Sequence, residues 1–227
     1  MYKMEFPETQ AQIYLADQRG VSQVGFLHSF HTFNFGGYFD ESRKPFGNLQ
    51  VLNDDTLKAG YSLKMQLREN TDVIIIPIVG GLEYHNSLEK GFLEAGQVQI
   101  FSASSGMDFE INNPYQTETI NFIQIWLKKT DTDFVAKNQI TSFNLQDKNQ
   151  LMPIFSIDKQ QGFIGKYDGR KKGELIIESN VFAFVIDGVF EVQDRLLHAR
   201  DGLALSNFKT IDFEALSNES VILLFRN

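Results

Sequence analysis

The chain consists of short apolar runs that are interrupted by glycine turns, and this pattern favours strands over helices. Residues 73–79 form one such run, which ends at a Gly-Gly pair at 80–81. Residues 183–186 form another, which ends at an Asp-Gly pair at 187–188. Short runs rich in Val, Ile and Phe, bounded by Gly, Asn and Asp, are typical of strands. The sequence therefore predicts an all-β protein with few short helices.

The two runs also begin a repeated unit. Residues 81–84 resemble residues 188–192, and another glycine follows each segment after a similar interval, at Gly96 and Gly202. A glycine pair or an Asp-Gly pair between apolar runs indicates a tight β-hairpin. We interpret the pattern as one hairpin unit used twice, in two related β domains.

A polar segment separates the two halves of the chain. Residues 128–149 are rich in Lys, Asp, Asn and Gln, and they follow an alternating strand at 122–127 that carries the only tryptophan. We interpret this segment as a connector that lies on the barrel surface. The predicted domains are residues 1–130 and residues 131–227, and the second includes the connector.

Composition excludes several classes of function. The net charge is −8 and the pI is about 5.0, whereas binding to nucleic acid requires a basic face. The absence of cysteine excludes thiolate catalysis, cysteine-ligated metal sites and disulfides. No apolar run approaches the roughly 20 residues that span a bilayer, and the first residues lack the apolar stretch of a signal peptide. We therefore expect a cytoplasmic protein with no nucleic-acid or membrane partner.

An ordered series of motifs resembles the pirin family of the bicupin group. In the first half they are His-Thr-Phe-Asn-Phe-Gly at 31–36, Phe-Gly-Asn-Leu-Gln-Val-Leu-Asn-Asp-Asp at 46–55, Gly-Leu-Glu at 81–83, Asn-Ser-Leu at 86–88, Ala-Ser-Ser-Gly at 103–106, Asn-Pro at 113–114 and Phe-Ile-Gln-Ile-Trp at 122–126. In the second half they are Ala-Phe-Val-Ile-Asp-Gly at 183–188 and Asp-Gly-Leu-Ala-Leu-Ser at 201–206. The resemblance implies two cupin β-barrels of the jelly-roll type packed face to face, with a metal only in the N-terminal barrel.

The resemblance also implies a metal site made of three histidines and one glutamate, which binds iron or another divalent metal. Some members cleave quercetin with dioxygen, and others bind transcription factors or metabolic enzymes. The family motifs are Met-His-Pro-His and Gly-x-x-His-x-Glu, and Met65 and Gly106 match their first residues. At the four ligand positions this chain has Gln66, Arg68, Phe109 and Ile111.

These four side chains lack the chemistry of a metal site. A guanidinium carries a permanent positive charge and has no lone pair to give to a cation, and phenyl and alkyl groups have no donor atom. Only the amide of Gln66 can ligate a divalent cation. Residues two apart on a strand point to the same side, so we expect all four side chains to share one pocket. We therefore expect no metal cofactor.

A one-residue slip in the second motif would change which side chains point inward. It would direct Asp108 and Glu110 into the barrel, where two carboxylates can bind a metal. The flanking motifs align without a gap, which favours an outward orientation for both carboxylates.

The histidines offer further candidates for chemistry. His28 and His31 could form a metal pair, but structural packing is the favoured interpretation. Glu83 and His85 share one face of a strand and could be ligands or an acid–base pair, and a surface cross-strand pair is favoured.

The favoured function is that of a metal-free pirin-like bicupin that binds a small molecule or a protein and has no catalytic residues. A small organic anion would suit the pocket, because Arg68 can pair with a carboxylate while Phe109 and Ile111 pack its body. Alternatively, these side chains simply fill the former site. Two enzymatic alternatives remain: a quercetin 2,3-dioxygenase-like enzyme with a displaced metal, and a metal-independent cupin enzyme whose acid and base the sequence does not identify.

Overall fold

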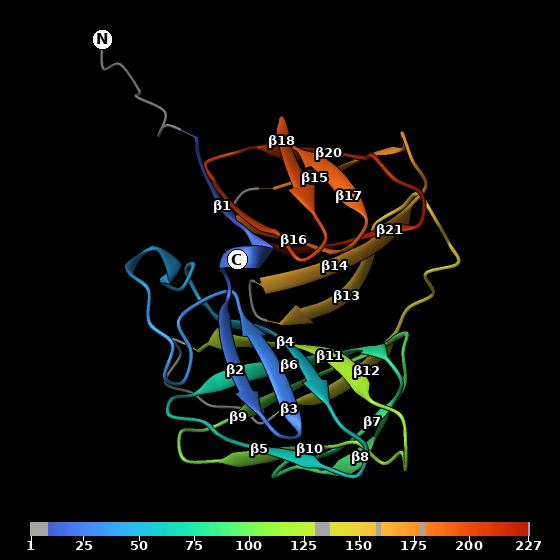
Figure 1. Cartoon of the computed structure of the whole chain (residues 1–227). Helices are drawn as coiled ribbons and strands as arrows, with labels where there is room; N and C mark the ends of the chain where they lie inside the picture. The colour runs from blue at the N-terminus through green and yellow to red at the C-terminus, as the bar shows by residue number, and fades with distance from the viewer. Residues whose placement is uncertain (1–8, 130–136, 158–159, 178–179, 227) are drawn as a thin grey trace. The chain divides into compact units, whose positions relative to one another are not determined.

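The computed structural model describes residues 9–129, 137–157, 160–177 and 180–226. Their regular structure consists of antiparallel strands and two single-turn 3-10 helices, η1 (Ala16–Gln18) and η2 (Glu41–Arg43) (Figure 1). The prediction of an all-β fold is therefore confirmed. Neither of these short helices has the length and apolar character needed to cross a membrane.

The chain divides into two compact units whose boundaries differ from the predicted ones. One unit contains residues 19–144, and the other combines the described residues up to Gln18 with those from Leu145 onward. The cause is β1 (Gln10–Tyr14), which pairs along its whole length with β19 (Gly202–Ser206). The predicted boundary at 130–131 falls in residues 130–136, which lie outside the described part of the chain.

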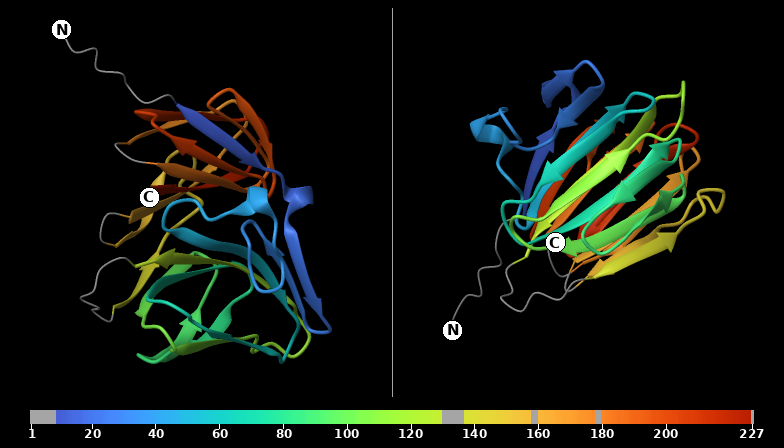
Figure 2. Two further views of the ribbon diagram at one scale, coloured as in Figure 1. Left: turned by 90° about the vertical axis from the view of Figure 1, so that its left-hand side faces the viewer. Right: turned by 90° about the horizontal axis from the view of Figure 1, so that it is seen from below.

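The unit of residues 19–144 is built from a seven-stranded and a four-stranded sheet. In pairing order, the strands of the larger sheet are β12 (Asn138–Ser142), β9 (Gln97–Ala103), β6 (Thr71–Val79), β11 (Ile120–Lys128), β4 (Leu49–Leu57), β3 (Leu27–His31) and β2 (Gly20–Val24). Those of the smaller sheet are β5 (Ser62–Gln66), β10 (Asp108–Asn112), β7 (Leu82–His85) and β8 (Lys90–Leu93). The predicted connector thus contains an edge strand, β12, while β2 and β3 at the opposite edge lie side by side (Figure 2).

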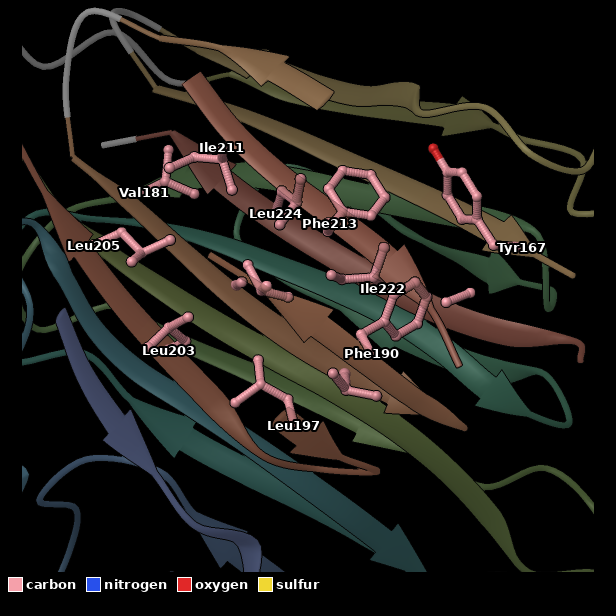
Figure 3. Close-up of a cluster of buried hydrophobic side chains, with 14 of the residues drawn as sticks. Tyr167, Val181, Phe190, Leu197, Leu203, Leu205, Ile211, Phe213, Ile222 and Leu224 are labelled. Carbon is pink, nitrogen blue, oxygen red and sulfur yellow. The ribbon is translucent and has the colours of Figure 1, made fainter. Parts of the chain in front are cut away.

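The second unit has the same two-sheet plan. Its six-stranded sheet has the order β1, β19, β16 (Val181–Asp187), β21 (Ser220–Arg226), β14 (Gln160–Tyr167) and β13 (Met152–Ile157). Its four-stranded sheet has the order β15 (Lys172–Ile176), β20 (Thr210–Ala215), β17 (Val189–Val192) and β18 (Arg195–His198). Side chains from both sheets meet in one buried cluster (Figure 3). In it the rings of Tyr167 and Phe213 meet edge to face, with their centroids 5.2 Å apart, a favourable aromatic geometry.

The predicted repeat is present, but the interpretation of its glycine turns as hairpins was wrong. β6 pairs with β9 and β11, and β7 pairs with β8 and β10, so the turn at 80–81 takes the chain from the larger to the smaller sheet. The turn at 187–188 does the same between β16 and β17. The hairpins are β7–β8 and β17–β18, one strand later in each unit. Both turns are corners, and Gly80 and Gly188 have φ of 75° and 77° there.

Candidate functional site

β10 directs two of the four predicted positions into the interior of the first unit. Its exposed fractions alternate, and Phe109 and Ile111 are 3% and 0% exposed. The ring of Phe109 lies edge-on to Phe101 and Trp126, with centroids 5.4 Å and 6.0 Å away. These two side chains therefore form part of the apolar core between the two sheets.

The other two predicted positions do not join them. Gln66 and Arg68 are exposed, and Phe109 faces Met65 across the β5–β10 pair. Ile111 faces Leu63 in the same way. Because residues directly opposite each other on antiparallel strands share a face, the interior side of β5 carries the odd-numbered residues. The expectation of one pocket lined by all four positions is therefore corrected.

The reason lies in the alternation of residues 63–68. Leu63 and Leu67 are 7% and 1% exposed and belong to the core, and Met65 packs against it. The residues between them are Lys, Gln and Arg. Shifting a strand by one residue exchanges the side chains that face the core and the solvent. The orientation that buries Leu63, Met65 and Leu67 is favoured because it removes apolar surface from water. This alternation is visible in the sequence, and it was a better guide to the orientation of β5 than the motif match.

Asp108 and Glu110 lie on the outer face of the small sheet, as the favoured interpretation had them. Asp108 is exposed and lies opposite Gln66, whereas Glu110 is half-buried and lies opposite Lys64. The Lys64 Nζ and a Glu110 carboxylate oxygen are 3.7 Å apart. The motif match therefore predicted the wrong inward-facing residues for β5. For β10 it predicted them correctly, and both carboxylates lie on the outer face.

The residues at the four positions do not fit the divalent metal that the resemblance implies. Two of them are buried hydrocarbon side chains, and the two polar ones lie on the opposite face of β5. Within the described ranges, no three His, Asp or Glu side chains come close enough to hold a metal ion. An amide and a guanidinium on the solvent side cannot complete a site inside the barrel.

A buried polar row crosses the interior of the same unit, and sequence reasoning missed it. His31, Asn53 and Gln124 lie directly opposite one another on β3, β4 and β11, and each is at most 1% exposed. His31 Nδ1 lies 2.9 Å from Asn53 Oδ1, and His31 Nε2 lies 2.8 Å from the Ser22 hydroxyl. The signal was available, since polar residues follow an apolar pair at 53–55 and interrupt an apolar run at 124.

The row continues to a fully buried carboxyl group. Trp126 Nε1 donates to Gln124 Oε1 over 3.0 Å, and Gln124 Nε2 donates to Asp55 Oδ2. Burial raises the pKa of Asp55 to about 7, and hydrogen bonds with Ser29 and Gln124 offset only part of this effect. Burial also lowers the pKa of His31. The Trp126 ring thus links the core around Phe109 to an acid with a strongly raised pKa.

The remaining histidine candidates have structural or surface positions. The predicted structural role of His31 agrees with its buried hydrogen bonds, and His28 packs its ring 4.4 Å from that of Phe30. Glu83 and His85 are both exposed on the outer face of β7. Glu83 accepts a hydrogen bond of 2.7 Å from Asn112, which faces it on β10. The favoured interpretation of a surface cross-strand arrangement agrees with these positions.

Comparison with known sequences gives a consistent family. A sequence model described as pirin matches residues 15–127, and one described as the quercetinase C-terminal cupin domain matches residues 162–226. The chain is 27% identical over 226 residues to quercetin 2,3-dioxygenase of Escherichia coli strain K12, which covers 93% of this chain and 97% of that protein. It is also 25% identical over 223 residues to a pirin-like protein of Caulobacter vibrioides. That alignment covers 92% of this chain and 96% of the Caulobacter protein.

Comparison with solved structures gives the same fold. The crystal structure of YhhW from Escherichia coli matches with a TM-score of 0.86 at 23% identity, covering 96% of this chain and 97% of that one. The bacterial pirin YhhW in complex with nickel(II), also from Escherichia coli, matches with a TM-score of 0.85 at 23% identity, covering 96% and 98%. Both units therefore have the cupin barrel fold that the resemblance implied.

Proposed function

The chain belongs to the pirin family of bicupins, and from this membership we propose that it acts by binding a small molecule or a protein, without the family's metal-dependent dioxygenase chemistry. The observation that supports the proposal is the environment of Phe109 and Ile111. Both occupy ligand positions of the family motif, and both are buried in apolar core. A metal ion at the family's site requires lone-pair donors at these positions, and phenyl and alkyl groups have none.

The form of binding differs from the anion pocket that the sequence suggested. Arg68 is exposed and its neighbour Leu67 fills the interior, so an anion paired with Arg68 would bind outside the barrel core. The ligand of the proposed function is therefore expected on an outer surface, and the barrel interior serves as a packed scaffold. Such a role is compatible with a protein partner, as in the regulatory members of the family.

The alternative function is that of a quercetin 2,3-dioxygenase-like enzyme. It is favoured by the name of the Escherichia coli relative, which matches 93% of this chain at 27% identity. It requires a metal bound by residues other than the four at the motif positions. A metal-independent enzyme needs an acid and a base at one accessible site, and the buried Asp55 and His31 do not meet that requirement.

Metal quantification and a turnover assay separate these functions. The protein would be purified without added metal, and its iron, nickel, copper, manganese and zinc would be measured, with the Escherichia coli relative prepared in parallel. We expect less than about a tenth of an equivalent of any metal in this chain, because its motif positions direct no lone-pair donor into the barrel interior. We also expect no quercetin consumption when each metal is added back. Stoichiometric metal together with metal-dependent turnover would contradict the proposal.

A further inference from the structure

Residues 35–38 form a tight turn beside the buried polar row of the first unit. The Phe35 N–H donates to the Tyr38 carbonyl over 3.3 Å, and the Tyr38 N–H donates to the Phe35 carbonyl over 2.9 Å. Between them Gly36 and Gly37 are exposed, and a side-chain carbon added to either glycine would have no atom within 4 Å. No described residue therefore packs against the middle of the turn, whereas each of its ends carries an aromatic ring.

The ring of Phe35 covers the middle of the polar row. Its centroid lies 4.9 Å from that of the His31 ring on β3 and 5.5 Å from that of the Trp126 ring on β11. β4 runs between these two strands, and its Asn53 lies directly opposite His31. Because the Phe35 ring packs against residues on both sides of β4, it lies over the part of β4 that carries Asn53.

The ring of Tyr38 covers the end of the same row. Gly20 on β2 lies directly opposite His31, so a side chain at this position would point to the same interior face. A carbon added to Gly20 would lie only 2.2 Å from the Tyr38 ring, which therefore fills this space. The two rings of the turn thus lie side by side over the row, Phe35 above Asn53 and Tyr38 next to His31.

This arrangement leaves a buried polar group without a full hydrogen bond. Asn53 is 1% exposed, its Oδ1 lies 2.9 Å from His31 Nδ1, and its Nδ2 has no acceptor among the described residues. The aromatic ring above it is only a weak acceptor, whereas water accepts a normal hydrogen bond. The closed position of the turn is therefore stabilised by ring packing and destabilised by the amide that it keeps from water.

We propose that residues 35–38 act as a lid, whose opening lets water reach the polar row while the barrel stays folded. The base of the lid stays fastened, because the Asn34 N–H donates to the Arg43 carbonyl over 2.9 Å and the Asp40 N–H donates to Asn34 Oδ1 over 2.7 Å. The inference goes beyond the proposed function, since it gives the barrel a moving part that binding on an outer surface does not use. Metal content does not bear on it.

Hydrogen exchange of the natural protein, followed by NMR, tests the lid. The probes are the backbone N–H of Tyr38, which closes the turn, and the side-chain NH₂ of Asn53, which lies beneath it. We expect both to exchange through one local opening, at least about a hundredfold more often than the backbone amides of β4 and independently of low urea concentrations. Exchange of the Asn53 NH₂ only together with β4 would overturn the proposal, and so would its exchange without that of Tyr38.

A pair of glycine variants tests the part that the rings play. Gly20→Ala places a methyl group where the Tyr38 ring lies, so the lid should be displaced. We expect the Asn53 NH₂ to exchange at least about tenfold faster, and acrylamide to quench Trp126 fluorescence more strongly. Gly25→Ala on the same β2–β3 hairpin is the matched control, because the added carbon has no atom within 4 Å and neither glycine has a positive φ. Unchanged Asn53 exchange in Gly20→Ala, with its dispersed spectrum retained, would contradict the lid.

Discussion

Among the residues that the structure describes, Asp55 is the carboxylic acid whose pKa burial raises most. It is fully buried, it accepts a hydrogen bond from Gln124, and burial raises its pKa to about 7. The indole N–H of Trp126 can only donate, so its bond to Gln124 Oε1 fixes the amide and directs the Gln124 NH₂ group to Asp55. A tryptophan, an amide and an acid are thus held in one defined arrangement inside the barrel.

The raised pKa predicts a pH-dependent stability of the first unit. The folded-state pKa of about 7 lies above the ordinary value of 3.8, so the folded state binds more protons between these two pH values. The contribution of Asp55 to stability is therefore lost as the pH rises from about 4 to about 7. The upper limit of this loss is a few kcal/mol, because each unit of pKa difference corresponds to about 1.4 kcal/mol.

Asp55→Asn should remove this pH dependence. Its amide can accept from Gln124 and stays neutral, so we expect the variant to gain stability over the natural protein as the pH rises from 5 to 8. Urea unfolding followed by the fluorescence of Trp126 measures this, since the chain has only this tryptophan. His31 has the opposite effect on how stability depends on pH, because burial lowers its pKa. Both proteins contain His31, so this effect cancels when they are compared. The control is Asp108→Asn, which changes an exposed acid. Parallel pH profiles for Asp55→Asn and the natural protein would refute the expectation.

Substitutions at the four motif positions should fall into two classes. Phe109→Ala removes a ring from the apolar core, and we expect a loss of about 3–5 kcal/mol in unfolding free energy. Gln66→Ala and Arg68→Ala change exposed side chains and should stay within about 0.5 kcal/mol. Trp126 fluorescence in urea measures all three. A large loss from Gln66→Ala would mean that the even-numbered residues of β5 face the core.

At the scale of elements, the sequence was a good guide to strands and a poor one to their partners. The apolar run at 73–79 and the two-residue spacing of Phe109 and Ile111 indicated strands where β6 and β10 lie, because burial of apolar side chains leaves a local pattern in the sequence. The glycine turn at 80–81 was read as a hairpin, yet it is a corner between sheets. A glycine pair indicates that the chain turns, but it does not indicate which strand pairs with the next one. That pairing depends on residues far away in the sequence. The motif match similarly predicted the wrong face for β5, since Gln66 lies on its exposed side.

The corner at Gly80 predicts an effect beyond backbone strain. A methyl group at this residue would lie 3.0 Å from the Ile120 side chain, and φ is 75°. Gly60 is a matched control in the same unit, since its φ is 72° and no atom lies within 4 Å of the added carbon. Gly60→Ala should cost about 1 kcal/mol through the positive φ alone, and Gly80→Ala should cost more. Equal losses, measured through Trp126 fluorescence, would show that the contact with Ile120 relaxes freely.

At the scale of the whole molecule, two units repeat one plan with different boundaries from those that motifs suggested. In both, a large-sheet strand passes a corner into a small-sheet hairpin and returns to the large sheet, as β6 to β9 and as β16 to β19. The family resemblance anticipated this duplication. The assignment of β1 to the second unit was beyond sequence reasoning, because its partner β19 lies about 190 residues later and five residues carry too short a pattern to reveal the pairing.

Deletion of residues 1–14 should therefore weaken the second unit selectively. β1 covers one edge of its larger sheet, and Tyr14, which is 3% exposed, packs its ring 5.5 Å from Phe182. We expect faster amide hydrogen exchange in β19 and β16, while β6 and β11 of the first unit keep their protection. Hydrogen exchange measured by mass spectrometry on the intact and shortened chains is the test. Equal acceleration in β6 and β19 would contradict the division into units.

The pairing of β1 with β19 has a consequence for the order in which the chain matures during synthesis. The first unit is continuous in sequence, whereas the second opens at the beginning of the chain and is interrupted until residue 145. Domains fold as units while the ribosome extends the chain at about 5–20 residues per second. The ribosome therefore starts the second unit before the first unit but finishes it afterwards. Until β19 is synthesised, β1 has no strand to pair with, although the whole first unit is already available to fold.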